Sequence, residues 1–287
     1  MSGAIGGAVR VGGLDGVLLA RSERGDGRHQ VVSTRLGGRD VVVKLYGRKR
    51  AYLPTLLRAF GHRFLVGKTG LSARARRDTE ARLIGLWRAH GFAAPAVLDL
   101  ALPEPVFGPY LVLERIDGPT VDARLRDPGA AQTDLGAGLA RFAAEWSRRH
   151  GLAERLAEPG LVHAHASFAH LLEHGGEWST FDFEYAYTDV RRVEQLVAVE
   201  IASLVATLRR AAGARAAPLL RALVAGYTDR GRLERVVADG AVGRFRGLES
   251  LARVIPALRA RGPRKLRESV GWITPRHTSR FASQASR

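Results

Sequence analysis

The chain has 287 residues, of which 46% are hydrophobic, so it can bury one large core or two modest ones and is too apolar to be disordered over most of its length. Its net charge of +17 comes almost entirely from arginine, which a compositional bias explains at least as well as nucleic-acid binding does. The absence of cysteine excludes disulfides and thiolate metal sites. The absence of a long apolar run predicts a cytoplasmic protein, with attachment to the inner face of a membrane as the alternative.

The first third of the chain predicts an antiparallel sheet. Apolar runs at 16–20, 30–36 and 39–46 are separated by glycine-containing turns, which is the pattern of three strands in a meander. A basic segment broken by Pro54 and Gly61 follows, and then a helix over 72–90 that ends at Gly91. Two further short strands are expected within 93–102 and 109–120.

The remainder predicts helices. Apolar residues recur at helical spacing over 135–146 and 193–208, and two more helices are expected around 218–230 and 244–259. We therefore predict an α+β protein of two lobes. The expected parts are a β-rich lobe over 1–117, a helical lobe over 118–261 and a loose basic tail over 262–287.

Lys44 conflicts with its setting, because it interrupts the apolar strand sequence VVVKLY and a buried ammonium needs a partner. Glu80 shares a helix face with Leu83, Ile84 and Trp87, so its carboxylate is expected to point toward the core. One interpretation is an ion pair between the strand and the helix. The other is that Lys44 lies near a sheet edge and reaches solvent along its own stem.

The sequence FDFEY contains a second conflict. If it is extended, Phe181, Phe183 and Tyr185 share one face, and Asp182 and Glu184 project together from the other. Two such carboxylates suit a hard divalent cation such as Mg²⁺. Ion pairing with some of the many arginines is an equally good interpretation.

Taken in order, five segments resemble the protein-kinase-like fold, especially its small-molecule branch: VVVKLY, EARLIGLWRAHGFAAPAVL, YLVLERIDGPT, GLVHAHASFAHLL and FDFEYAY. DFEYA is similar to the metal-binding segment of choline and aminoglycoside kinases. The basic insertion after VVVKLY and the helix that follows it are similar to lipopolysaccharide core kinases, including Kdo and heptose kinases. The resemblance spans about residues 16–210.

The resemblance implies that the protein binds ATP with Mg²⁺ or Mn²⁺. Lys44 would hold the nucleotide phosphates and would itself be oriented by Glu80. Asp182 matches the metal-binding aspartate of the family, and Glu184 lies close behind it in the sequence.

The resemblance also implies where the rest of the nucleotide is held. Gly25 and Gly27 take the place of the glycine-rich loop, although the family's full spacing of glycines is missing. Backbone groups from Glu114 to Ile116 would receive the adenine.

The histidine segment HAHASFAH departs from the family pattern H-G-D-x-x-x-x-N. His163 keeps the first position, but His165 replaces the aspartate that accepts the proton of the acceptor hydroxyl, and His170 replaces the asparagine that helps to hold the metal. Neutral imidazole can still accept a proton. As a metal ligand, His170 suits Zn²⁺ or Mn²⁺ better than Mg²⁺.

Three interpretations of this segment stay open. The first is an active kinase that phosphorylates a hydroxyl of a small molecule or glycolipid, with His165 and Asp182 as its catalytic residues. The second is a pseudokinase that acts as a scaffold or regulatory interaction module. The third is a metal site made of His163, His165 and His170 with Asp182.

The basic insertion suggests the kind of partner. Its six basic residues are expected either to face an anionic substrate or membrane surface or to form a solvated basic helix; they are Arg48, Lys49, Arg50, Arg58, Arg63 and Lys68. Nucleic-acid binding is the rival from another class, but the sequence contains no recognised nucleic-acid motif.

Overall fold

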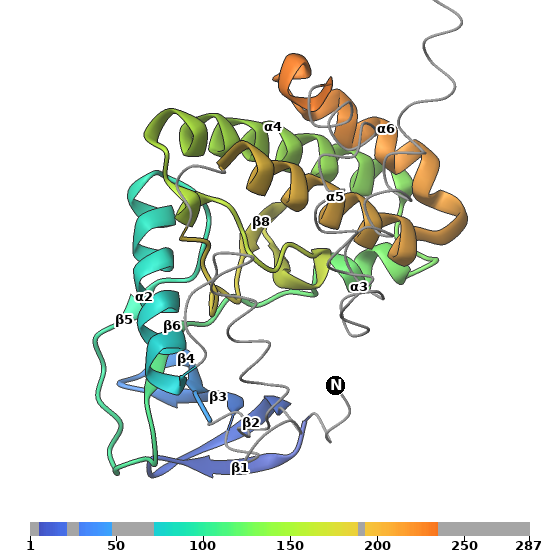
Figure 1. The fold of residues 1–287 in the computed structure, drawn as a ribbon. Coiled ribbons are helices and arrows are strands. Elements are labelled where there is room, and N and C mark those ends of the chain that lie inside the picture. Colours follow the sequence, from blue (N-terminus) through green and yellow to red (C-terminus); the bar gives the residue numbers. More distant parts are fainter. Residues whose placement is uncertain (1–5, 22–28, 48–71, 189–192, 235–287) are drawn as a thin grey trace, which may run out of the picture. The chain divides into compact units, whose positions relative to one another are not determined.

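The computed structural model describes residues 6–21, 29–47, 72–188 and 193–234, and the chain divides into two compact units. The first contains the sheet and the helix that follows it, and the second contains most of the helices (Figure 1). Their bounds are Met1–Pro119, Pro159–His165 and His170–Val190 for the first unit, and Thr120–Glu158, Ala166–Ala169 and Arg191–Arg287 for the second.

The first unit is built on a six-stranded antiparallel sheet with the strand order β1-β2-β3-β4-β6-β5. Val32, Val41, Val43 and Val112 are buried on one face of it, because alternate residues of a strand point to the same side. The strands are β1 Ala8–Val11, β2 Leu14–Arg21, β3 Gln30–Leu36, β4 Arg39–Leu45, β5 Val97–Leu98 and β6 Tyr110–Glu114.

The predicted meander is confirmed as β2, β3 and β4, and the α+β class is confirmed with it. The predicted first helix is α2, Ala73–Ala89, which begins where the side chain of Ser72 accepts a hydrogen bond from the backbone N–H of Ala75. β1 was missed because its four residues follow a glycine-rich start and are too short for a periodicity. The strand expected within 93–102 is β5, which has two residues.

FDFEY does not form a strand, and the extended geometry considered for it does not hold at Asp182. A hairpin of β7 (Leu171–His174) and β8 (Glu177–Thr180) comes just before it, and no strand continues through 181–186. The reason is Asp182, whose φ of 66° lies in the left-handed region that breaks a strand.

The predicted division at residue 117 also needs correction, because 159–165 and 170–190 belong to the first unit. Backbone hydrogen bonds join residues 170–190 to the preceding part of the first unit. The N–H of Thr180 donates to the carbonyl of Ala93, and the N–H of Glu173 donates to that of Pro119. Gly118 permits the second approach, since a Cβ at its position would lie 1.8 Å from the carbonyl oxygen of Glu173.

The second unit is helical, as predicted. Its helices are α3 Val121–Arg126, α4 Gln132–Leu156, α5 Val193–Ala212 and α6 Ala216–Gly226. Glu200 of α5 is buried and accepts hydrogen bonds from Trp146 and Arg149 of α4, so the two helices share a satisfied polar contact within their core. The helix expected over 244–259 and the tail over 262–287 lie outside the described residues.

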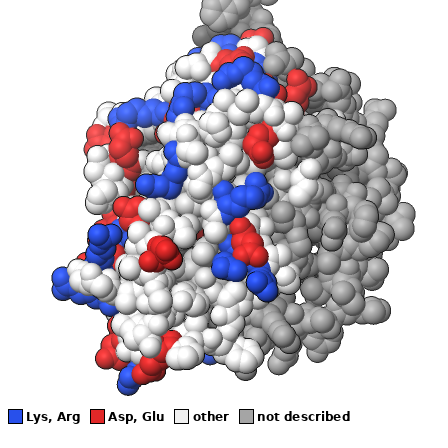
Figure 2. Space-filling model, turned by 90° about the vertical axis from the view of Figure 1, so that its left-hand side faces the viewer, with Lys and Arg blue, Asp and Glu red and all other residues white. Residues whose placement is uncertain are grey.

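The positive charge is unevenly distributed along the chain. The described residues carry almost equal numbers of basic and acidic side chains, so most of the excess lies in 48–71 and 235–287. On the face drawn in Figure 2, basic and acidic side chains of the described residues are interspersed and gather into no single basic patch. None of the helices that the structure describes has both the length and the hydropathy that crossing a bilayer requires.

Two glycines of the second unit test the packing of α4 on α6. A Cβ at Gly226 would lie 2.2 Å from the carbonyl oxygen of Ala140, whereas one at Gly136 would lie 3.7 Å from the Cβ of Ala222, an ordinary contact. We expect Gly226→Ala to lower the free energy of unfolding by about 1–3 kcal/mol through overpacking. Gly136→Ala should raise it by roughly 0.5–1 kcal/mol, since alanine favours a helix interior. Urea unfolding of both variants checks this, and equal stability would contradict the helix packing.

Candidate functional site

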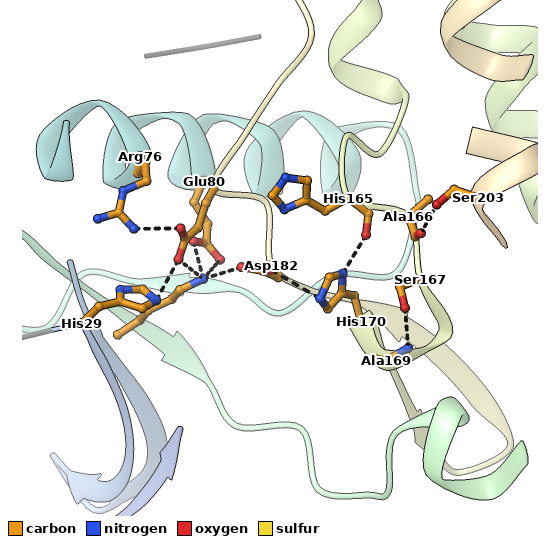
Figure 3. Close-up of polar contacts among 12 residues, drawn as sticks. His29, Arg76, Glu80, His165, Ala166, Ser167, Ala169, His170, Asp182 and Ser203 are labelled. Carbon is orange, nitrogen blue, oxygen red and sulfur yellow. Dashed lines mark hydrogen bonds and ion pairs between the residues drawn. The ribbon is translucent and has the colours of Figure 1, made fainter. Parts of the chain in front are cut away.

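Lys44 lies between three carboxylates of the first unit. Its Nζ donates to both oxygens of Glu80, at 3.0 and 2.8 Å, and to Oδ1 of Asp182 at 2.9 Å (Figure 3). The same atom is 3.1 Å from Oε1 of Glu184. We call these four residues the Lys44 centre. The interpretation of Lys44 as a buried strand residue paired with Glu80 is therefore the one the structure supports.

Three different elements bring the Lys44 centre together. β4 is an inner strand, paired with β3 and β6, and places Lys44 in the buried part of the sheet. Glu80 comes from the buried face of α2. Asp182 and Glu184 follow the β7–β8 hairpin, where the left-handed turn at Asp182 allows both to face the same ammonium despite the loss of regular strand geometry.

A second set of side chains surrounds the carboxylates. Tyr46 donates its hydroxyl to Oε2 of Glu80 at 2.6 Å. Arg76, which is 1% exposed, donates to Oε2 of Glu184 at 2.9 Å and to the carbonyl of Gly47. His29 Nε2 lies 3.1 Å from the other oxygen of Glu184. Glu184 is thus held by cationic and N–H groups on both oxygens, which is the arginine ion pair that the sequence left open.

Burial and charge act in opposite directions on the ionisation of the centre. Burial disfavours the ammonium of Lys44, but the carboxylates of Asp182, Glu80 and Glu184 outweigh it and raise its pKa well above the usual value. Burial likewise disfavours the carboxylate of Asp182, yet Lys44 dominates and holds its pKa well below the usual range, and the same is true of Glu184. Lys44, Asp182 and Glu184 are therefore charged at neutral pH, and Asp182 and Glu184 lose their stabilising contribution only in strong acid. Burial raises the pKa of Glu80 against the attraction of Lys44, but both of its oxygens accept hydrogen bonds from Lys44 and one also accepts from Tyr46, as those of a carboxylate do.

Glu80, Asp182 and Glu184 are the one group of three possible metal ligands within 4.8 Å of one another that the described part of the chain contains. Lys44 Nζ already contacts all three, so the ammonium takes the place that a shared cation would need. A metal ion fits only where a carboxylate oxygen remains outside these contacts. That position is Oδ2 of Asp182, whose side chain is 26% exposed, whereas Glu80 and Glu184 are buried.

The three histidines do not form a common metal site, and that interpretation was wrong. His163 is buried and packs edge-on against Trp87 and Phe183. The ring of His165 packs against Tyr185 with centroids 4.6 Å apart. His170 does lie beside the centre, with its Nε2 3.5 Å from Oδ2 of Asp182. The assignment of His170 to the asparagine position of the family stays a prediction.

The sequence also predicted nucleotide contacts from Gly25, from Gly27 and from the backbone of residues 114–116. Gly25 and Gly27 lie outside the described residues. Glu114 ends β6 and is bound to Ala96, whose backbone N–H donates to the Glu114 carboxylate and whose carbonyl accepts from the Glu114 N–H. Ile116 is half-buried in the segment that follows. An adenine contact from Glu114 to Ile116 stays a prediction.

Sequence reasoning missed Tyr46, Arg76 and His29, although the spacing of two of them from Lys44 or Glu80 could have predicted their place in the site. Arg76 lies four residues before Glu80, so helical spacing alone places it on the same face of α2. Tyr46 lies two residues after Lys44, so strand alternation places both side chains on the same face. His29 is found only from the register, in which Gln30 pairs with Leu45 and His29 therefore falls opposite Tyr46.

No family model and no curated protein sequence matches this chain. Among solved structures, it is similar to vaccinia related kinase 3, at 13% identity and a TM-score of 0.31 over 65% of this chain, which spans about half (52%) of that kinase. It is also similar to the Rio2 kinase from Chaetomium thermophilum, at 17% identity and a TM-score of 0.36 over 79% of this chain and 74% of that one. Both TM-scores are below 0.5, so the functional proposal rests on the geometry of the site.

Replacing Glu184 tests whether the centre is one charge network. Glu184→Gln keeps the shape but leaves the buried guanidinium of Arg76 without its counter-charge, so we expect a loss of about 3–5 kcal/mol in the free energy of unfolding. The control is Glu104→Gln, which breaks an exposed ion pair with Arg10 and should change stability by less than about 1 kcal/mol. Chemical denaturation measures both, and a mild effect at Glu184 would show that Arg76 is satisfied in another way.

Proposed function

We propose that this protein is kinase-like and binds ATP with a divalent metal ion at the Lys44 centre. The observation that carries the proposal is a buried ammonium held by three carboxylates, one of which, Asp182, keeps an oxygen toward a partly exposed edge. In the kinase arrangement a strand lysine, oriented by a helix glutamate, holds nucleotide phosphates, and an aspartate holds the metal. Lys44, Glu80 and Asp182 are the residues of this chain that correspond to these roles.

A purely structural ion pair explains the centre less well. Burying charges carries a desolvation penalty that their mutual attraction often fails to repay, and well-packed apolar residues of similar size would stabilise the fold as much or more. Strongly perturbed ionisation in a charged cluster is more typical of functional sites. The first unit instead buries Lys44, Glu80, Glu184 and Arg76 together, each below 10% exposed.

The charge balance of the centre makes nucleotide binding dependent on metal. Its three carboxylates face Lys44 and Arg76, which leaves one excess negative charge when Glu80 is counted as ionised and His29 and His170 as neutral. A triphosphate alone would be repelled by this excess. A divalent ion on Asp182 would reverse the local charge and join the protein to the phosphates, which is the chemistry that Mg²⁺ or Mn²⁺ supplies in such sites.

Phosphate transfer to a hydroxyl of a small molecule or glycolipid is the reaction we propose, with His165 as the proton acceptor. The acceptor class rests on the sequence resemblance to lipopolysaccharide core kinases. An anionic glycolipid or membrane surface would suit the basic segment 48–71, which lies outside the described residues. A cytoplasmic location, with attachment to the inner face of a membrane as the alternative, belongs to the same proposal.

A pseudokinase is the second candidate, and two contacts of His165 favour it, because they give this residue a structural role that needs no proton transfer. The ring of His165 packs against Tyr185, and its backbone carbonyl accepts the N–H of His170, so this residue contributes to the local packing as well as to any chemistry. Such a protein would bind nucleotide and act as a scaffold or regulatory interaction module.

ATP binding is tested by the shift in melting temperature with ATP and either Mg²⁺ or Mn²⁺. At a hundred times its dissociation constant, the ligand should stabilise the protein by about 2.7 kcal/mol, which raises the melting temperature by roughly 4–5 °C for a chain of this size. Asp182→Asn keeps the side-chain shape and should abolish the metal-dependent shift. Asp99→Asn, at an exposed position of the same unit, should leave it intact. The absence of a shift with either metal would contradict the proposal.

ATP hydrolysis, with water in place of the alcohol, separates the two candidates. An active kinase should release ADP slowly, and His165→Ala should lower that rate by about a hundredfold or more, because a general base contributes that much. A wild-type protein that binds ATP and releases no ADP would support the pseudokinase.

A further inference from the structure

The ring of His170 is oriented by a backbone carbonyl. Its Nδ1 lies 2.7 Å from the carbonyl oxygen of His165 (Figure 3). A carbonyl oxygen can only accept, so Nδ1 must carry the proton of this hydrogen bond. In the neutral ring the lone pair is then on Nε2, at the opposite side of the imidazole.

That lone pair faces a second acceptor. Nε2 of His170 lies 3.5 Å from Oδ2 of Asp182, while Oδ1 of the same carboxylate accepts from Lys44. Two electron-pair donors directed at one another repel unless a cation lies between them. The cation is either a second proton on His170 or a metal ion, and both side chains are open to it, since they are 27% and 26% exposed.

We propose that His170 and Asp182 form the protein's half of a site that selects a transition-metal ion such as Co²⁺, Mn²⁺ or Zn²⁺ over Mg²⁺. The inference deepens the proposed function and rests on it for the remaining ligands, which nucleotide phosphates and water would supply. Imidazole suits ions of this class, whereas Mg²⁺ prefers oxygen ligands in near-ideal octahedral geometry.

The distance between the two ligand atoms fits one shared ion. Nitrogen and oxygen ligands lie about 2.1 Å from Zn²⁺, so two ligands at a tetrahedral angle are separated by about 3.4 Å. The observed 3.5 Å between Nε2 and Oδ2 is close to that value. The hydrogen bond from Nδ1 to a carbonyl is also typical of metal-bound histidine, since it sets the tautomer and the ring orientation.

The rest of the centre explains why the site would have only two protein ligands. Glu80 and Glu184 contact Lys44 and lie deeper than Asp182, so their carboxylates are not available to an ion at Oδ2. An ion held by one nitrogen and one oxygen binds weakly by itself. Its affinity should therefore rise when a nucleotide adds phosphate oxygens.

The test is a Co²⁺ titration followed by visible absorption, with and without ADP, on the wild type and two variants. His170→Asn restores an oxygen ligand and should weaken Co²⁺ binding by about tenfold or more. The same variant should bring the ADP-induced thermal shift in Mg²⁺ up to the level seen with Co²⁺. Each titration is repeated at pH 8, where fewer protons compete with the metal ion for an imidazole nitrogen.

His174→Asn is the matched control. His174 is the exposed last residue of β7, the strand that begins directly after His170, and its Nδ1 likewise lies 2.7 Å from a backbone carbonyl oxygen, that of Asp117. This variant removes a histidine of the same kind without touching Asp182. Its Co²⁺ affinity and its thermal shifts should equal those of the wild type.

The possible results separate this inference from the proposed function. If ADP stabilises the protein equally with Mg²⁺ and Co²⁺ and His170→Asn changes neither, nucleotide binding stands and the metal selection is refuted, with a proton as the cation between the two side chains. If Co²⁺ binds and is lost in His170→Asn while ADP has no effect with any metal, the two-ligand site stands and the nucleotide proposal fails. The absence of Co²⁺ binding at pH 8, with or without ADP, also refutes the site.

Discussion

The first unit depends on the ion pairs around the ammonium of Lys44. This one group joins an inner strand, the buried face of α2 and the segment after the β7–β8 hairpin, three stretches far apart in sequence. Removing either sign of charge would leave the other buried and uncompensated, which destabilises a protein more than the intact cluster stabilises it. The position of Asp182 therefore follows from the charge balance of the whole centre, and so does the position of any ion it holds.

The convergence of Asp182 and Glu184 was predictable, but its cause was not. Strand alternation predicted that both carboxylates share a face, and both do contact the same ammonium. The backbone reaches this result by another route, with a left-handed residue at Asp182 in place of a regular strand. A left-handed aspartate has no signal in a hydrophobic pattern, because the pattern reports burial and not the sign of φ.

Periodicity predicted the strands and helices that are long enough to repeat, such as β3, β4, α2 and α5. It could not predict β1 or the β7–β8 hairpin, each strand of which has four residues. Within the site, Lys44 and Glu80 were found because each is a charge in an apolar stretch. His29 was not, since its place beside Glu184 depends on how the β3–β4 register continues and on where a distant segment returns.

The two carboxylate oxygens of Asp182 have different partners. Oδ1 belongs to Lys44 and to the stability of the unit, whereas Oδ2 faces His170 and the partly exposed edge. A substitution at position 170 can therefore change the surroundings of Oδ2 without removing any of the contacts that Lys44 makes. That separation gives a physical reason why a histidine is compatible with this position: its ring nitrogen faces one oxygen of Asp182 and leaves the contacts of the Lys44 centre intact.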